Sequence, residues 1–272
     1  MNNKKEERER KKIIICIIAR IESKRLPKKV IKTIKNKTII EHLITKLKVI
    51  TCKDIELAIC TTSQKEDDKL EDIARKNKVH CIRGSVLSVS DRILEAAKLI
   101  NADIVVRVTG DNIFTDPILL QKLITEHINE NADYSRIENI PIGVTAEVIN
   151  VETLQKCFQE NNKEESEYMT LHLYQPSKYN VLVLIAEDSN KNINLSIDTP
   201  NDFTRTVEIF KYLKNNYSTT DVMNVIKEHR IPYSVVDKEA KIKLIDKVLG
   251  YEEYNKYLLN LQQQAMTKII TI

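Results

Sequence analysis

Residues 13–29 read IIICIIARIESKRLPKK, and this stretch decides the first part of the fold. The run from Ile13 to Ile18 contains no polar residue, which is typical of a strand buried on both faces of a parallel sheet. Five basic residues crowd the turn that follows: Arg20, Lys24, Arg25, Lys28 and Lys29. Like charges this close repel one another and gain nothing for folding. The turn is therefore either a solvated basic loop or a place where an anionic partner binds.

Strand and helix patterns alternate from this strand to about residue 130. Strand patterns cover 55–63, 79–84 and 103–109, and helical patterns cover 38–50, 66–77, 91–100 and 116–128. In the last helix, Asp116 is expected as the N-cap and Pro117 at the first helical position. Such alternation predicts right-handed βαβ units and a mostly parallel sheet covered on both faces. Because strands become more frequent after residue 130, we predict a three-layer α/β/α sandwich with a mixed sheet.

Composition excludes several other classes of protein. The 272 residues are 42% hydrophobic, enough for one large domain, and their 43 basic and 39 acidic side chains nearly balance, unlike those of a dedicated nucleic-acid binder. A membrane span or signal peptide is not expected, because no apolar run approaches twenty residues. We therefore expect a cytoplasmic protein. The five cysteines lack the spacing of a zinc site or a disulfide framework, so any metal would be a hard cation held by carboxylates.

The turn after Ile18 contains neither a GxxxxGK[ST] nor a GxGxxG motif, so a phosphate there would be held by side chains. Arg20, Arg25 and Lys29 could supply charged contacts to a triphosphate, and Ser23 could supply a hydroxyl group. In open α/β sheets, ligands bind outside the carboxyl ends of the strands, where this turn is expected to lie.

Two aspartates, Asp111 and Asp198, are also predicted at strand ends. A magnesium ion that binds a polyphosphate takes one or two carboxylates from the protein, and the pair would meet that need if the fold brought them together. Taken singly, each is better explained as a helix cap or a turn former.

Seven segments in order resemble one family. They are ARIESKRLPKK (19–29), TTSQKEDD (61–68), IRGS with DRILEAA (82–97), VRVTGDNIFTDP (106–117), IGVTAEV (142–148), EYMT (167–170) and IDTPNDF (197–203). Together they resemble the cytidylyltransferases typified by spore-coat polysaccharide biosynthesis proteins and, more distantly, the CMP-3-deoxyoctulosonate and CMP-sialic acid synthetases. The resemblance implies the nucleotide-diphospho-sugar transferase-like fold.

The resemblance also implies roles for individual residues. The nucleotide would contact Ala19, Arg20, Ser23, Arg25, Lys29, Arg83, Ser85, Arg92 and Asp111. Arg20, Lys29 and Asp111 would be catalytic, and Asp111 and Asp198 would bind Mg²⁺. On the acceptor side the implied residues are Glu147 and Tyr168. Because an anionic acceptor calls for further cations, Arg107 and Arg136 are also candidates, and surface ion pairing is the simpler explanation for both.

Three positions depart from the family pattern: Lys28 stands where Gly is frequent, Ile113 where Pro is frequent, and Tyr168 where His is usual. Ile113 is expected to alter only the turn. Lys28 adds charge beside the triphosphate site, and Tyr168 points to a different acceptor or a different hydrogen-bond partner.

The sequence thus predicts an Mg²⁺-dependent cytidylyltransferase that transfers CMP from CTP to an anionic acceptor, such as an acidic sugar or a phosphorylated small molecule, in surface polysaccharide synthesis. Two alternatives stay open: a glycosyltransferase that uses a sugar nucleotide, although a suitable DxD motif is lacking, and a degenerate nucleotide-binding or scaffold protein.

Three parts of the chain are predicted. Residues 1–12 form a flexible charged leader, 13–236 the nucleotidyltransferase domain, and 237–272 a helical extension. The extension either packs on the domain or forms the contact of a homodimer, since related enzymes are commonly dimers.

Overall fold

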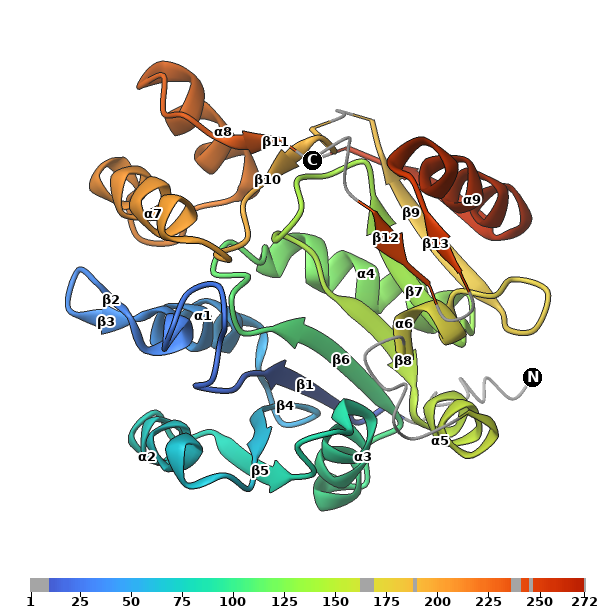
Figure 1. Cartoon of the computed structure of the whole chain (residues 1–272). Helices are drawn as coiled ribbons and strands as arrows, with labels where there is room; N and C mark the ends of the chain where they lie inside the picture. Colours follow the sequence, from blue (N-terminus) through green and yellow to red (C-terminus); the bar gives the residue numbers. More distant parts are fainter. Residues whose placement is uncertain (1–9, 162–168, 188–189, 236–240, 245–246, 272) are drawn as a thin grey trace, which may run out of the picture.

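A mixed, mostly parallel sheet forms the centre of the protein (Figure 1). The computed structural model describes residues 10–161, 169–187, 190–235, 241–244 and 247–271. Within them the main sheet has the strand order β14-β9-β7-β8-β6-β1-β4-β5. Its strands are β1 (Ile13–Ile18), β4 (Ile55–Thr62), β5 (His80–Gly84), β6 (Ile104–Thr109), β7 (Tyr134–Glu138), β8 (Glu147–Asn150), β9 (Val181–Ala186) and β14 (Met266–Ile270). β8 runs antiparallel to both of its neighbours and the other pairs are parallel, which confirms the predicted fold class.

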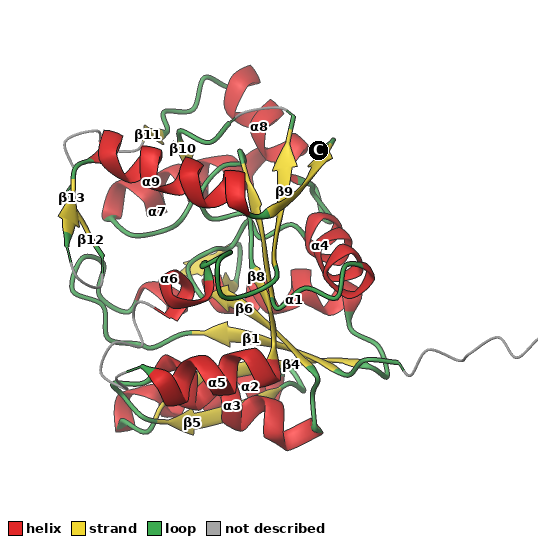
Figure 2. Ribbon diagram, turned by 90° about the vertical axis from the view of Figure 1, so that its right-hand side faces the viewer, coloured by secondary structure: helices red, strands yellow, loops and turns green. Residues whose placement is uncertain are grey.

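Helices cover both faces of this sheet (Figure 2). The buried core on one face includes side chains of α1 (Ile39–Leu47), α2 (Asp68–Lys76), α4 (Pro117–Asn129), α7 (Pro200–Tyr212) and α8 (Thr219–Glu228). The core on the other face includes side chains of α3 (Val89–Ile100), α5 (Val151–Glu160) and α6 (Met169–Leu173), with α9 (Tyr251–Gln264) packed against it. β1 supplies both cores, because successive side chains of a strand point to opposite faces.

Short elements complete the described chain. They are the 3₁₀ helices η1 (Lys29–Ile31), η2 (Lys48–Ile50) and η3 (Lys65–Asp67), and the two-stranded pairs β2 (Thr33–Ile34) with β3 (Lys37–Thr38), β10 (Ile193–Asn194) with β11 (Ser234–Val235), and β12 (Ile242–Lys243) with β13 (Val248–Leu249).

The N-cap predicted for α4 is present and also joins two helices. One carboxylate oxygen of Asp116 accepts hydrogen bonds from the backbone N–H groups of Ile118 and Leu119, and Pro117 occupies the first turn. The other oxygen accepts from the backbone and hydroxyl of Thr219, at the start of α8, at 2.7 and 2.9 Å. Asp116 is 2% exposed, so its charge is satisfied by four donors rather than by water.

The C-terminal segment differs from the helical extension expected. The β12–β13 hairpin precedes α9, which begins only at Tyr251, and the apolar tail then forms β14. β14 lies parallel to β9 and extends the main sheet, and it buries Ile270. The extension therefore contributes a strand of the central sheet as well as a helix.

At the other end, residues 1–9 of the predicted leader lie outside the described residues. Residues 10–12 contact the sheet, where the Lys12 backbone N–H donates to the Asp103 carboxylate at 2.8 Å. Among the helices described, none has the length and apolar content needed to cross a bilayer.

A buried histidine makes stability depend on pH. His127 of α4 is 2% exposed, and burial lowers its pKa to about 4, while the ring nitrogen Nδ1 lies 2.7 Å from the Ser135 hydroxyl. A histidine in the unfolded chain has a pKa of about 6.5, so on acidification the unfolded state takes up the proton first. The free energy of unfolding should then fall by about 1.4 kcal/mol per pH unit between these two pKa values.

The melting temperature measured from pH 7 to pH 4.5 should therefore drop less steeply for His127→Gln than for the parent protein. The matched control is His229→Gln, at an exposed residue after α8. Equal slopes for all three proteins would show that His127 does not cause the acid sensitivity.

Candidate active site

The basic turn and the Asp111 turn meet because β1 and β6 are adjacent and parallel. Their carboxyl ends therefore lie side by side, and the Gly110 backbone N–H donates to the Ile18 carbonyl oxygen at 2.8 Å. A Cβ at position 110 would lie 2.9 Å from the Cβ of Ala19 and 3.2 Å from that carbonyl oxygen. Only glycine lets the two turns approach this closely.

Lys29 contacts both predicted metal-binding aspartates. Its Nζ forms a hydrogen-bonded ion pair with Asp111, 82 positions away in sequence, and another with Asp198, 169 positions away, at 3.0 Å. Arg25 also donates to Asp198, at 2.7 Å. Burial by itself would lower the pKa of Lys29, but the two carboxylates outweigh it and raise the pKa, so the ammonium group stays charged.

Neither Asp111 nor Asp198 caps a helix. Thr199 caps α7, and its reciprocal partner is the Asp202 carboxylate. The backbone segments of the two aspartates are also joined, because the Ile197 N–H donates to the Asp111 carbonyl oxygen at 3.2 Å. The helix-cap explanation that the sequence left open is therefore wrong for both residues.

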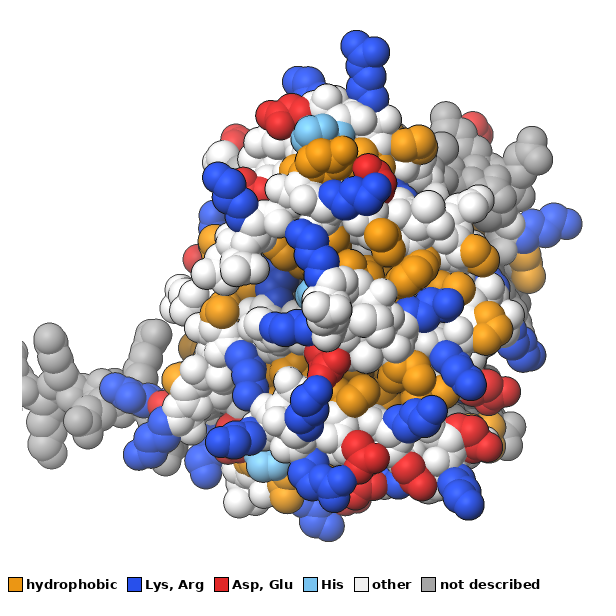
Figure 3. Space-filling view, turned by 90° about the vertical axis from the view of Figure 1, so that its left-hand side faces the viewer, with side chains coloured by type: hydrophobic (Ala, Val, Ile, Leu, Met, Phe, Trp, Pro, Cys, Tyr) orange, Lys and Arg blue, Asp and Glu red, His pale blue; other side chains and the backbone are white. Residues whose placement is uncertain are grey.

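A cavity of about 380 Å³ lies over these turns. Most of the residues predicted to contact the nucleotide line it: Ala19, Arg20, Ser23, Arg25, Lys29, Arg92 and Asp111. In Figure 1, β1 and β6 point to the left, and Figure 3 shows Lys and Arg side chains spread over the face on that side. The cavity thus combines several cationic side chains with the Asp111 carboxylate.

Arg92 is the most deeply buried cation in this cavity. Its side chain comes from α3, the residue is 4% exposed, and burial lowers its pKa. Within the described structure, its buried Nε and Nη1 atoms have no hydrogen-bond partner. A Cβ at Gly84 would lie 3.0 Å from the Arg92 Cγ, so glycine leaves room for this side chain. Buried, unused donors of this kind suit a ligand that brings its own acceptor oxygens.

Two other residues predicted to contact the nucleotide do not line the cavity. Arg83 donates to Glu71 and to the Gln64 carbonyl oxygen, both at 2.8 Å, and it also pairs with Asp68. The Ser85 hydroxyl instead accepts a hydrogen bond from the backbone N–H of Ser88 at 3.1 Å. Arg83 is thus drawn toward the acidic side chains at the start of α2.

The departures from the family pattern have structural explanations where they are described. Lys28 is exposed and adopts φ 58°, in the left-handed region that favours glycine, immediately before η1. Ile113 is buried in the core beside the Asp111 turn. Tyr168 lies outside the described residues.

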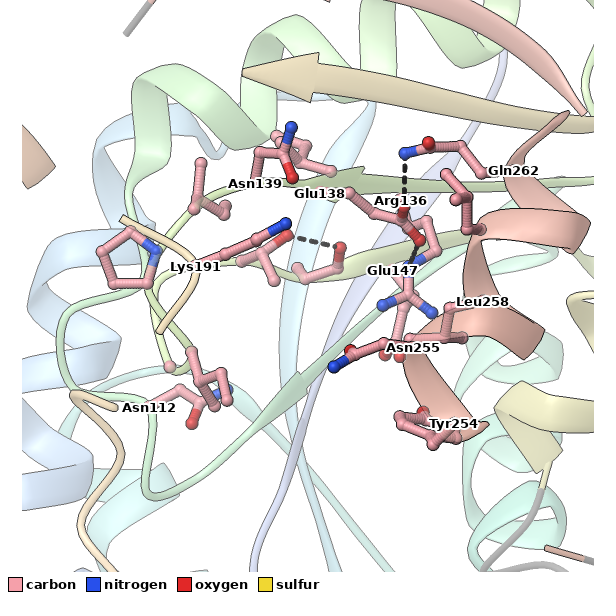
Figure 4. Close-up of a pocket in the computed structure, with 18 of the residues that line it drawn as sticks. Asn112, Arg136, Glu138, Asn139, Glu147, Lys191, Tyr254, Asn255, Leu258 and Gln262 are labelled. Atoms are coloured by element: carbon pink, nitrogen blue, oxygen red, sulfur yellow. Dashed lines mark hydrogen bonds and ion pairs between the residues drawn. The ribbon is translucent and has the colours of Figure 1, made fainter. Parts of the chain in front are cut away.

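A second cavity, of about 710 Å³, has Asn112, the residue after Asp111, in its lining (Figure 4). Thr109 lines both cavities, and Asn112 lines the second. Arg107 of β6 and Glu147 of β8, both predicted on the acceptor side, form an ion pair at 2.7 Å in its wall. Sequence reasoning missed the contribution of α9, whose Tyr254, Asn255 and Leu258 face this cavity. The amphipathic pattern of the extension was the available signal.

The donor set around Asp111 and Asp198 fits a magnesium ion. Both carboxylates already contact one cation, the Lys29 ammonium, and both are partly exposed, at 18% and 20%. The part of the chain that the structure describes holds no cluster of three or more His, Cys, Asp or Glu residues arranged as metal ligands. Two carboxylates are nevertheless enough where phosphate and water complete the shell.

Comparison with known proteins adds evidence of another kind. A model of the cytidylyltransferase family matches residues 14–238. The chain belongs to the cytidylyltransferase family. This membership confirms the predicted enzyme class, a nucleotidyltransferase.

Three relatives illustrate the match. The spore coat polysaccharide biosynthesis protein SpsF of Bacillus subtilis is 29% identical over 238 residues, which cover 84% of this chain and 98% of that protein. A solved cytidylyltransferase from Leptospira borgpetersenii superposes with a TM-score of 0.74 at 27% identity, covering 81% of this chain and 95% of the other. A CMP:2-keto-3-deoxy-manno-octonic acid synthetase, solved with CTP, shares the fold with a TM-score of 0.58 at 16% identity, covering 74% and 98%.

The close contact at Gly110 can be tested with a pair of glycine variants. Gly110→Ala should lower the free energy of unfolding by about 1–3 kcal/mol, because the new methyl group overpacks the β1–β6 junction. Gly250→Ala is the control, since a Cβ there would meet only a Glu253 carboxylate oxygen, at 3.7 Å. Urea unfolding measures both; equal stability of the two variants would argue against a packed junction.

Proposed function

We propose that this cytidylyltransferase transfers CMP from CTP to an anionic acceptor and releases pyrophosphate. The observation that carries the proposal is the Lys29 ion pair with Asp111 and Asp198, set among the cationic side chains of the first cavity. In the reaction, an acceptor oxygen bonds to the α-phosphorus as the bond to the pyrophosphate oxygen breaks. A surface polysaccharide is the proposed destination, in keeping with the name of the Bacillus subtilis relative.

The residues of the first cavity would bind and neutralise the triphosphate. Arg20, Arg25 and Lys29 would contact phosphate oxygens and stabilise the charge that develops on the departing pyrophosphate. Arg92 would donate its unused N–H groups to the nucleoside. Positioning and charge neutralisation of this kind do most of the work in phosphoryl and nucleotidyl transfer.

Asp111 and Asp198 would hold Mg²⁺, which when bound supplies Lewis-acid activation of the α-phosphate. The Lys29 ammonium group contacts both carboxylates and so holds them on the same side of the first cavity's turns.

On the acceptor side, Arg107 would attract the anionic substrate, while Glu147 keeps this arginine oriented. Because Thr109 lines both cavities, an acceptor in the second cavity would lie next to a nucleotide in the first. A cytoplasmic location and a homodimeric state also belong to the proposal, as expectations from the sequence.

The first experiment measures thermal stabilisation by CTP, UTP, ATP and GTP, each with and without Mg²⁺. A ligand that binds only the native state raises the melting temperature. CTP with Mg²⁺ should give the largest shift. A larger shift with another nucleotide would overturn CTP as the donor, and no shift with any of them would overturn nucleotide binding.

Two arginine variants then locate the site. Arg20→Ala should weaken CTP binding by roughly tenfold or more, because a charge-assisted hydrogen bond to a phosphate is lost. Arg83→Ala should leave CTP affinity unchanged, since that side chain is held by Glu71 and Asp68. Isothermal titration calorimetry measures the CTP dissociation constant of both variants. Weaker binding in Arg83→Ala than in Arg20→Ala would place the nucleotide elsewhere.

Asp111→Asn should reduce Mg²⁺-dependent pyrophosphate release by roughly 100-fold or more, because the carboxylate charge that holds the metal beside the reacting phosphate is removed. The control is Asp72→Asn, whose side chain is 65% exposed and pairs with Arg75 of the same helix, α2. Retention of most of the activity in Asp111→Asn would remove Asp111 from the metal site.

A further inference from the structure

The second cavity has a wall that lies outside the family match. The family model covers residues 14–238, whereas Ile242 and seven residues of α9 line the cavity. α9 buries none of its side chains fully in the described structure, although Leu258 and Leu261 pack against the core beside it. Residues beyond the family match therefore form one side of the cavity, and the α9 side chains on that side stay at least partly exposed.

The wall formed by the sheet carries two arginines. Arg107 and Arg136 project from β6 and β7, with side chains 23% and 26% exposed, and each pairs with one carboxylate, at 2.7 and 3.3 Å. The Glu138 partner of Arg136 also accepts a hydrogen bond from Gln262 of α9 at 2.7 Å. The buried Nε atom of Arg107 has no hydrogen-bond partner in the described structure. A guanidinium group has five N–H donors, so each arginine keeps donors beyond those that its carboxylate accepts, and these donors can bind an oxyanion.

The cavity also has an apolar part. It consists of Tyr254, Leu258 and Leu259 from α9 and of Ile140 and Ile142 from the loop after β7. Leu259 and Ile142 remain 53% and 46% exposed. Covering such side chains with an apolar part of a ligand is favourable.

Amide groups stand between the charged and apolar parts. Asn112 and Asn139 reach the cavity from the sheet side and Asn255 from α9, as Figure 4 shows. Each can both donate and accept hydrogen bonds, which suits the hydroxyl groups of a sugar.

From these three observations we propose that α9 selects the acceptor, and that the acceptor is a polyhydroxylated anion that carries an apolar substituent. Its oxyanion binds at Arg107 and Arg136, its hydroxyl groups meet the asparagines, and its apolar substituent lies against Leu258 and Tyr254. The inference rests on the proposed function. It adds the chemical class of the acceptor and names α9 as the segment that determines acceptor specificity.

The experiment compares acceptors in the pyrophosphate-release assay with CTP and Mg²⁺. The probes are the N-acetyl, N-propanoyl and N-glycolyl forms of neuraminic acid, and 3-deoxy-manno-octulosonate, which has no acyl group. The N-acetyl and N-propanoyl forms should have kcat/KM values roughly tenfold or more above the other two, since a methyl or methylene group in an apolar pocket changes specificity by about that factor.

Equal or higher kcat/KM for the N-glycolyl or the non-acylated acceptor would overturn the inference, and so would absence of turnover with every probe while CTP still binds. A protein that fails to bind CTP would instead contradict the proposed function itself.

A matched pair of α9 variants separates selection from packing. Leu258 and Leu261 lie one turn apart and pack against the same core cluster, but only Leu258 lines the cavity. Leu258→Ser should lower kcat/KM for N-propanoylneuraminate by roughly tenfold without a matching loss for 3-deoxy-manno-octulosonate. Leu261→Ser should lower the melting temperature about as much as Leu258→Ser does. It should leave unchanged the ratio of kcat/KM for N-propanoylneuraminate to kcat/KM for 3-deoxy-manno-octulosonate. An identical ratio in both variants would show that α9 only supports the fold.

Arg136→Gln tests the anion contact. It should raise KM for every acidic acceptor with a smaller effect on kcat, and leave the CTP-induced thermal shift unchanged, because Arg136 does not line the first cavity. An unchanged KM would remove Arg136 from the acceptor site.

Discussion

A single lysine ties together the segments on which the candidate active site depends. Lys29 belongs to the basic turn, Asp111 follows β6, and Asp198 precedes α7; the lysine contacts both carboxylates. Two carboxylates held close together repel each other, and the ammonium group that contacts both offsets part of that repulsion. Its raised pKa shows that the pairing outweighs the cost of burying the charge.

The sheet explains why this ion pair can form. Because β1 and β6 are parallel neighbours, the two turns emerge at one edge, and Gly110 lets their backbones touch. The capping of α7 by Thr199 and Asp202 leaves the Asp198 side chain to pair with Lys29 and Arg25. The packing that builds the fold and the charges that suit a nucleotide are therefore properties of the same few turns.

The two cavities differ in their chemistry. The first gathers cations around Asp111, and the second combines arginines with an apolar wall. They meet at Thr109, at the carboxyl end of β6, where the reacting atoms of two substrates would have to meet. The wall supplied by α9 lies beyond the family match, so relatives can share the nucleotide cavity and differ in the acceptor cavity.

Local patterns in the sequence predicted a large part of this structure. The buried run from Ile13 to Ile18, the strand and helix alternation, and the cap at Asp116 are decided by residues close together in the chain. The basic turn and its cluster of cations could be identified for the same reason. Sequence could not exclude Arg83 from the cavity or include α9, because both outcomes depend on contacts between distant segments.

The sequence by itself thus determined the fold class, the helix caps and the chemistry of the turn after β1, since hydrophobic periodicity and charge are local properties. The tertiary structure decided which aspartates share Lys29, which arginines face a cavity, and what the C-terminal segment covers. Those outcomes follow from strand order and from packing between residues as much as 169 positions apart, which no short stretch of sequence can specify.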